Sequence, residues 1–242
     1  MFFSSCTMRC VYCQNWQISW EGTGNKVSRE SLTDKMLELQ EEKCHNINLV
    51  SPTQYVNQII EAIKIAKKRG LRLPIVYNTN GYDTVATIKK LDGIVDIYLP
   101  DIKYSDDNTA YRFSGVKNYV KRNREAILEM YKQVGNLKLD SKDIAFKGLL
   151  VRHLVLPEDI AGSYASLEFL ASISREIWIS IMAQYHPCYK AKENPPLDRK
   201  ITKEEYQQVL RWVDELGFEN VLAQELESAD CFLPDFNKKK PF

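Results

Sequence analysis

The chain has 242 residues, of which 44% are hydrophobic and 27% are charged, and its formal net charge is +1. These values indicate one globular domain, and the balanced charge excludes an electrostatic reason for a nucleic-acid or anionic-membrane partner. No apolar stretch approaches the roughly 20 residues that span a bilayer, and the start lacks the features of a signal peptide. A cytoplasmic location is therefore expected, where the six cysteines stay reduced.

Short apolar runs alternate with helical patterns along the chain, and each run predicts a strand. In chain order the runs are Phe2-Phe3 as a stub, then 47–50, 73–77, 94–99, 149–156, 177–182 and, more weakly, 220–223. Apolar residues at helical spacing fall within 32–39, 56–63, 126–134, 167–173 and 209–216. A capping box, Thr202-Lys203-Glu204-Glu205, opens the last of these helices, and Gly217 ends it.

This alternation shows no hairpin signal, so it predicts parallel strands joined by right-handed helical crossovers. About six units are too few for a closed eight-stranded barrel. We therefore predict an α/β fold, an open partial parallel β/α barrel of about six strands that is TIM-barrel-like, with a doubly wound sheet as second choice. Residues 1–242 are expected to form a single domain, with 236–242 as a solvated tail. The chain starts inside its first strand, which suggests a truncated N-terminus.

Three cysteines lie close together in the segment Cys6-Thr7-Met8-Arg9-Cys10-Val11-Tyr12-Cys13. A short loop can wrap thiols at this spacing around one iron–sulfur cluster, and such clusters usually take four thiolates. Three ligands without an obvious fourth suggest one iron left open for a small molecule. Two alternatives remain on spacing alone: a structural zinc site completed by residues such as Cys44 and His45, and a redox dithiol.

Polar side chains follow the predicted strands at their carboxyl ends, where parallel α/β barrels build active sites. They are Cys6, Ser51, Thr53, Asn78, Thr79, Asn80, Asp101, Lys103 and His186, with Arg152 inside its strand. Turn chemistry explains any single member, and Asp101 with Lys103 could form a structural ion pair. An acid, two bases and an amide-rich turn beside a cysteine cluster point instead to a ligand site. His153 alternates with Arg152 and is expected to pack beneath a helix.

The cysteine spacing, with an aromatic residue just before the last cysteine, resembles the signature of the radical S-adenosylmethionine (SAM) superfamily. With Gln14-Asn15, the chain is similar to the uncharacterised relatives of pyruvate formate-lyase activating enzyme. The similarity continues through 50–53, 99–104, 148–157 and 184–187. This resemblance implies that Cys6, Cys10 and Cys13 hold a [4Fe–4S] cluster whose open iron is chelated by SAM.

The resemblance also implies a set of cofactor-binding residues. Tyr12 would lie near the adenine, Asp101, Lys103 and His186 would line the cofactor, and Asn78, Asn80 and Arg152 would complete the site. Many family members carry a glycine-glycine-acid motif after the second strand, where the acid meets the amino group of SAM. Here the stretch reads Val50-Ser51-Pro52-Thr53. A hydroxyl of Ser51 or Thr53, or a backbone carbonyl, is therefore expected to serve instead.

The activity that the resemblance implies is reductive cleavage of SAM to a 5′-deoxyadenosyl radical that abstracts hydrogen, under anaerobic conditions. The substrate could be a glycyl residue of a partner enzyme, and a flavodoxin or ferredoxin-type protein would donate the electron. One alternative is radical chemistry on a small molecule or another peptide. A second is a non-catalytic zinc or electron-transfer protein. Three cysteines, Cys44, Cys188 and Cys231, are expected to be core or loop thiols, and Trp16 and Trp20 to serve packing.

Overall fold

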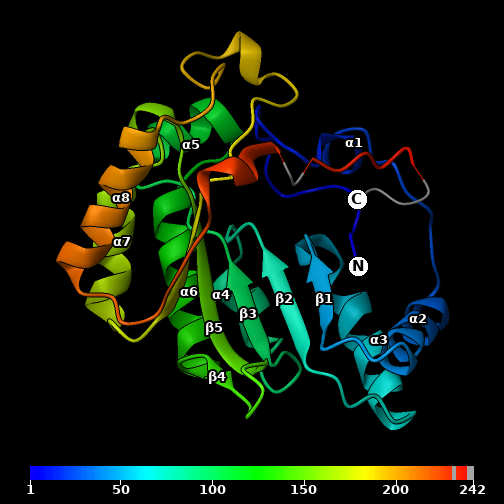
Figure 1. Ribbon diagram of the computed structural model, residues 1–242. Coiled ribbons are helices and arrows are strands. Elements are labelled where there is room, and N and C mark those ends of the chain that lie inside the picture. The colour runs from blue at the N-terminus through cyan, green and yellow to red at the C-terminus, as the bar shows by residue number, and fades with distance from the viewer. Residues whose placement is uncertain (231–232, 239–242) are drawn as a thin grey trace.

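A computed structural model of the chain describes residues 1–230 and 233–238. Parallel strands form a sheet in the order β1-β2-β3-β5-β6-β7 (Figure 1). Their bounds are Ile47–Val50, Ile75–Thr79, Ile97–Pro100, Ala145–Leu154, Trp178–Met182 and Val221–Ala223. Each parallel strand lies beside the next parallel strand along the chain, and β1 and β7 are the two ends of this order. The predicted open partial barrel is thereby confirmed, and the doubly wound alternative is not.

The sheet also contains a strand that the sequence did not predict. β4 (Lys138–Leu139) pairs antiparallel with the start of β5. The expectation of no hairpin was therefore wrong, because a strand of two residues is too short to show an alternating pattern. Its turn is held by Asp140, whose carboxylate accepts hydrogen bonds from the amides of Lys142 and Ile144. The predicted stub at Phe2-Phe3 is a single parallel bridge between Phe2 and Val50.

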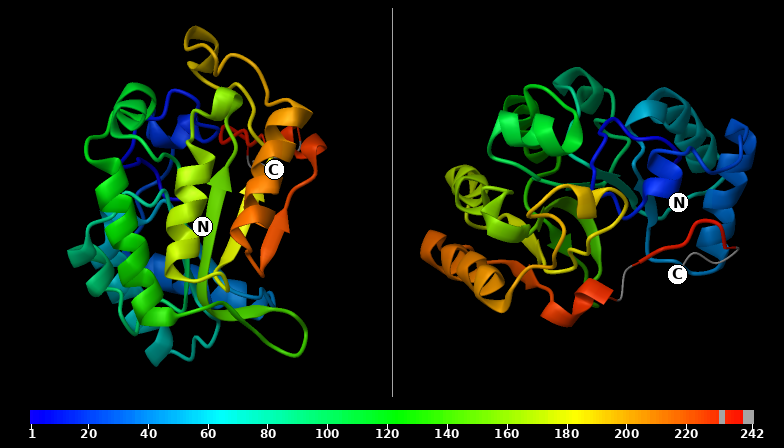
Figure 2. Two further views of the ribbon diagram at one scale, coloured as in Figure 1. Left: turned by 90° about the vertical axis from the view of Figure 1, so that its left-hand side faces the viewer. Right: turned by 90° about the horizontal axis from the view of Figure 1, so that it is seen from above.

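Helices cover the outside of the strands, and the view from above in Figure 2 shows them arranged in an arc. The five predicted helices are α2 (Arg29–Glu41), α3 (Val56–Lys68), α6 (Tyr119–Val134), α7 (Ser163–Ile173) and α8 (Lys203–Leu216). The short α1 (Trp16–Ser19), α4 (Val85–Lys89) and α5 (Asp107–Ser114) were not predicted, since one or two turns show little periodicity. In the described part of the chain, no helix has the length and apolarity of a membrane span.

Local sequence signals place two of these elements as expected. The capping box of α8 is formed in both directions between Thr202 and Glu205, and Gly217 ends the helix in the left-handed conformation at φ 72°. On β5, His153 is buried and its ring nitrogens lie 2.8 Å from the Ile102 carbonyl oxygen and 2.9 Å from the Ser163 hydroxyl of α7. Because side chains alternate along a strand, Arg152 faces the opposite side.

Candidate active site

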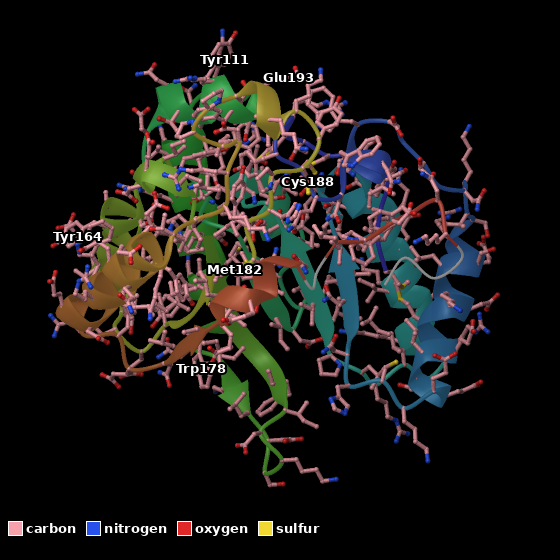
Figure 3. The ribbon with its side chains drawn as sticks, turned by 45° about the horizontal axis from the view of Figure 1, so that its top comes forward. Tyr111, Tyr164, Trp178, Met182, Cys188 and Glu193 are labelled. Atoms are coloured by element: carbon pink, nitrogen blue, oxygen red, sulfur yellow. The ribbon has the colours of Figure 1, made fainter. Side chains whose placement is uncertain are left out.

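A cleft opens at the carboxyl ends of the parallel strands. Its empty volume, including the part open to solvent, is about 860 Å³. Figure 3 brings this end forward, with Met182 at the end of β6 and Cys188 in the loop that follows. The predicted site residues on its wall are Cys6, Cys10, Tyr12, Cys13, Ser51, Asn78, Asn80, Asp101, Lys103 and Arg152. Thr53 and His186 do not line it.

The loop that carries the three cysteines is held from outside by backbone hydrogen bonds. The amides of Arg9 and Val11 donate to the carbonyls of Ser114 and Phe113 at the end of α5, each at 2.9 Å. The amide of Lys190, in the loop after β6, donates to the Val11 carbonyl at 2.9 Å. Two elements distant in sequence therefore fix this loop over the mouth of the barrel.

Each of the three thiols is hydrogen-bonded by a polar side chain from a different element. The pairs are Asn80 Nδ2 to Cys6 Sγ at 3.2 Å, Ser114 Oγ to Cys10 Sγ at 3.0 Å, and Ser19 to Cys13. Burial raises the pKa of Cys10 to about 12 and also raises the pKa of Cys13. Coordination to positively charged iron would offset this burial and hold both groups as thiolates.

The residues that could complete a zinc site do not lie beside the three thiols. Among the described residues, no three Cys, His, Asp or Glu side chains converge on a position for one metal ion. A structural zinc site needs four ligands around one point, whereas a four-iron cluster is held by thiolates spread around it. Cys44 and His45 precede β1 at the amino end of the sheet, so they cannot complete a site at the opposite end. Cys231 lies outside the described residues.

An ion network occupies the centre of the cleft wall. The Asp101 carboxylate pairs with Lys103 Nζ at 2.8 Å and with Arg152 Nη2 at 2.7 Å. Arg152 Nη2 also donates to Asn78 Oδ1 at 2.9 Å. Burial raises the pKa of Asp101, but the two cations outweigh this effect and bring that pKa below its ordinary value. Burial lowers the pKa of Lys103, but Asp101 and Cys10 outweigh this effect and raise that pKa above its ordinary value. The network keeps one excess positive charge, which suits a ligand carboxylate.

A glycine lets the loops after β2 and β3 meet at this network. Gly81 has φ +75°, and a Cβ there would lie 2.2 Å from the Asp101 carbonyl oxygen and 2.2 Å from Asn123 Nδ2. Asn123 Nδ2, on α6, donates to the carbonyls of both Gly81 and Asp101, at 3.1 and 2.9 Å. The close approach brings Asn80 and Asp101 into one mouth.

Thr53 lies in a 3₁₀ turn, Thr53–Tyr55, that directs its hydroxyl away from the cleft. The Thr53 and Tyr77 hydroxyl oxygens lie 3.2 Å apart. Tyr77 and Thr79 also donate to Asp83, a fully buried carboxyl whose pKa is raised by burial. These hydrogen bonds stabilise the end of β2 on the side away from the cleft.

At the predicted position of His186, the cleft wall is formed by its neighbours Gln184 and Tyr185. The Gln184 carbonyl accepts from Gln14 Nε2 at 3.0 Å, and the Tyr185 ring packs edge-on against Tyr12 at 5.9 Å. Sequence reasoning did not single out Ser19, which belongs to no motif, and it noted Gln184 and Tyr185 only within the stretch 184–187 of the resemblance. Gln14 was noted only as part of the resemblance.

The fold and site together define an α/β partial barrel with a three-cysteine metal site at the carboxyl ends of its strands. The sequence model of the Radical SAM superfamily matches residues 1–149, and the chain belongs to this superfamily. The family uses a [4Fe–4S] cluster and SAM, and the three thiols and the cationic network described above fit both.

Two relatives and two solved structures illustrate the similarity. An uncharacterised protein of Methanocaldococcus jannaschii, MJ0674, is 29% identical over 90% of this chain, which spans 62% of that protein's length. Pyruvate formate-lyase-activating enzyme of Clostridium pasteurianum is 25% identical over 73% of this chain and 69% of its own. The fold is shared with the hydrogenase maturase HydG of Carboxydothermus hydrogenoformans (TM-score 0.63, 12% identity, 93% of this chain and 53% of that one). It is also shared with SuiB of Streptococcus suis bound to SAM (TM-score 0.59, 13% identity, 95% and 51%).

Proposed function

We propose that the chain is a radical SAM enzyme that cleaves SAM reductively and uses the resulting 5′-deoxyadenosyl radical to abstract hydrogen from a substrate. The observation that carries this proposal is the placement of three thiols and the Asp101–Lys103–Arg152 network on one cleft wall. When bound, the cluster would supply the electron that breaks the sulfonium bond, and the protein would bind and orient SAM and exclude water from it.

The chain's own residues would bind the two ends of SAM. Lys103 and Arg152, oriented by Asp101, would receive the carboxylate of the methionine end. The Ser51 hydroxyl, rather than that of Thr53, would meet the amino group; this role is supported because Ser51 lines the cleft and the Ser51 carbonyl already accepts from Gln54 Nε2 at 3.1 Å. Tyr12, buried beside Tyr185, would form the apolar surface for the adenine.

Cleavage of SAM is directly measurable. Anaerobically reconstituted and reduced protein is expected to convert SAM into 5′-deoxyadenosine and methionine, quantified by chromatography. A fully loaded [4Fe–4S] cluster that yields no 5′-deoxyadenosine would contradict the enzyme and favour an electron-transfer protein. One equivalent of zinc with no cluster formed would favour a structural metal protein.

For the substrate, we propose a glycyl residue of a partner enzyme, supported by the 25% identity to the Clostridium pasteurianum activating enzyme. The altered stretch 50–53 favours, as a second candidate, a small molecule or another peptide. Incubation with a glycyl-radical enzyme and SAM separates the two, because only the first produces a glycyl radical signal in electron paramagnetic resonance (EPR).

For the electron donor, we propose an acidic flavodoxin or ferredoxin-type protein in an anaerobic cytoplasm. Two exposed cations, Arg9 and Lys190, lie over the Trp20 ring at 5.3 and 5.4 Å, and Trp20 Nε1 donates to the Cys10 carbonyl at 3.2 Å. This arrangement supports docking of a negatively charged partner beside the cluster loop.

Reversing both charges, Arg9→Glu with Lys190→Glu, is expected to slow cluster reduction by such a protein about tenfold at low salt. Reduction by dithionite should not change, because a small reductant needs no docking face. The matched control is Lys142→Glu with Lys147→Glu, two exposed lysines at the β4–β5 hairpin. Equal slowing in the control, or none in the Arg9 and Lys190 variant, would argue against this face.

A further inference from the structure

A buried chain of hydroxyl groups ends on one of the cysteine sulfurs. Ser114, the last residue of α5, is fully buried and its hydroxyl donates to Cys10 Sγ at 3.0 Å. The Tyr104 hydroxyl lies 2.7 Å from Ser114 Oγ, and the Tyr12 hydroxyl lies 2.6 Å from that of Tyr104. Tyr104 and Tyr12 are 1% and 5% exposed, so the chain is shielded from water along its length.

The direction of this chain follows from counting protons. A ligating thiolate has no proton, so it can only accept, and Ser114 must donate to it. Ser114 has one proton, so its oxygen accepts from Tyr104, and by the same reasoning Tyr104 accepts from Tyr12. All three donors therefore point toward the Cys10 sulfur and polarise one another.

We propose that Ser114, with Tyr104 and Tyr12 behind it, is a positioning residue that raises the reduction potential of the cluster held through Cys10. Reduction adds one electron and makes the cluster and its thiolates more negative. A donor aimed at a ligand sulfur stabilises the more negative state, and such hydrogen bonds are among the factors that set cluster potentials. The inference rests on the proposed function only for the presence of the cluster.

The relay predicts a graded loss. Ser114→Ala removes the donor itself and is expected to lower the equilibrium constant for one-electron reduction about tenfold, which corresponds to 59 mV. Tyr104→Phe keeps the Ser114 donor but removes the group behind it, so a smaller decrease is expected. Tyr12→Phe removes the most distant hydroxyl and should give the smallest decrease. The measurement is a redox titration of the reconstituted cluster followed by EPR, without SAM or substrate.

Two control variants match the burial and the chemical change. Ser166→Ala alters a fully buried serine of α7. Tyr98→Phe removes the hydroxyl of a tyrosine on β3, which donates to Gln133 of α6 at 2.6 Å. Neither should move the potential. The relay is overturned if Ser114→Ala and Tyr104→Phe leave the potential unchanged, or if the controls shift it equally.

Two further outcomes are distinguishable. If Ser114→Ala fails to fold or to take up iron, Tyr104→Phe alone decides, because it leaves the Cys10 contact in place. If the wild-type chain forms no cluster, the proposed function fails rather than the relay.

Discussion

Replacing Cys6, Cys10 or Cys13 singly with serine is expected to abolish cluster assembly and to lower 5′-deoxyadenosine formation by at least about 100-fold. Loss of an outer hydrogen-bond partner typically weakens a metal site by about 10–100-fold, and loss of a ligand should have a larger effect. Iron and sulfide content, visible absorption and EPR measure the cluster, and product chromatography measures the activity.

Other cysteines provide the controls for this experiment. Cys44 precedes β1 at the amino end of the sheet, so Cys44→Ser should keep both cluster and activity. Cys188 is half-buried in the loop after β6. Burial and, to a smaller extent, the nearby Cys13 raise the pKa of Cys188. Cys188→Ser should also keep the cluster if three thiols suffice. Full iron content in any of the three ligand variants would argue against the assigned ligand set.

Replacing the buried Asp101 with asparagine is expected to lower the free energy of unfolding by about 3 kcal/mol, because it leaves two partly buried cations without their shared anion. Binding of SAM should weaken as well, since Lys103 and Arg152 lose the group that orients them. Urea unfolding and equilibrium binding of SAM measure the two effects.

The matched control is Glu61→Gln, which breaks the pair between Glu61 and Arg29, whose side chains are each 53% exposed. An exposed pair contributes at most about 1 kcal/mol. If Asp101→Asn is no more destabilising than Glu61→Gln, the Asp101–Lys103–Arg152 network does not stabilise the fold as expected.

The same network predicts a pH dependence with a definite sign. The folded pKa of Asp101 is lowered, so its stabilisation is present above the unfolded value of about 3.9 and is lost as pH falls through the folded pKa. The folded pKa of Lys103 is raised, so its stabilisation is present below about 10.4 and is lost as pH rises through the folded pKa. The difference in unfolding free energy between wild type and Asp101→Asn should therefore be largest between about pH 4 and 10.

Elements with a repeated local pattern were predictable from the sequence. β1 and β6 are mostly apolar runs, interrupted only by Asn48 and Ser180, and α8 carries its own start and stop signals in Thr202 and Gly217. β4 and α5 are too short to show a period, and α5 supplies Ser114. The convergence of Asp101 with Arg152 was also predictable, because parallel strands bring their carboxyl ends to one edge of the sheet.

Contacts between residues far apart in the chain were not predictable. Ser114 lies 104 residues from Cys10, and Tyr104 lies 92 residues from Tyr12. The direction of a loop side chain, as for Thr53 in its 3₁₀ turn, depends on local backbone geometry that strand periodicity does not describe.

The sequence by itself determined the family resemblance and the three candidate cluster ligands, because the spacing of Cys6, Cys10 and Cys13 along one short loop is a local property. Only the tertiary structure decided which groups surround those sulfurs. The donors to the three thiols come from α1, the loop after β2 and the end of α5. Their approach depends on how the whole barrel packs, and no single segment encodes it.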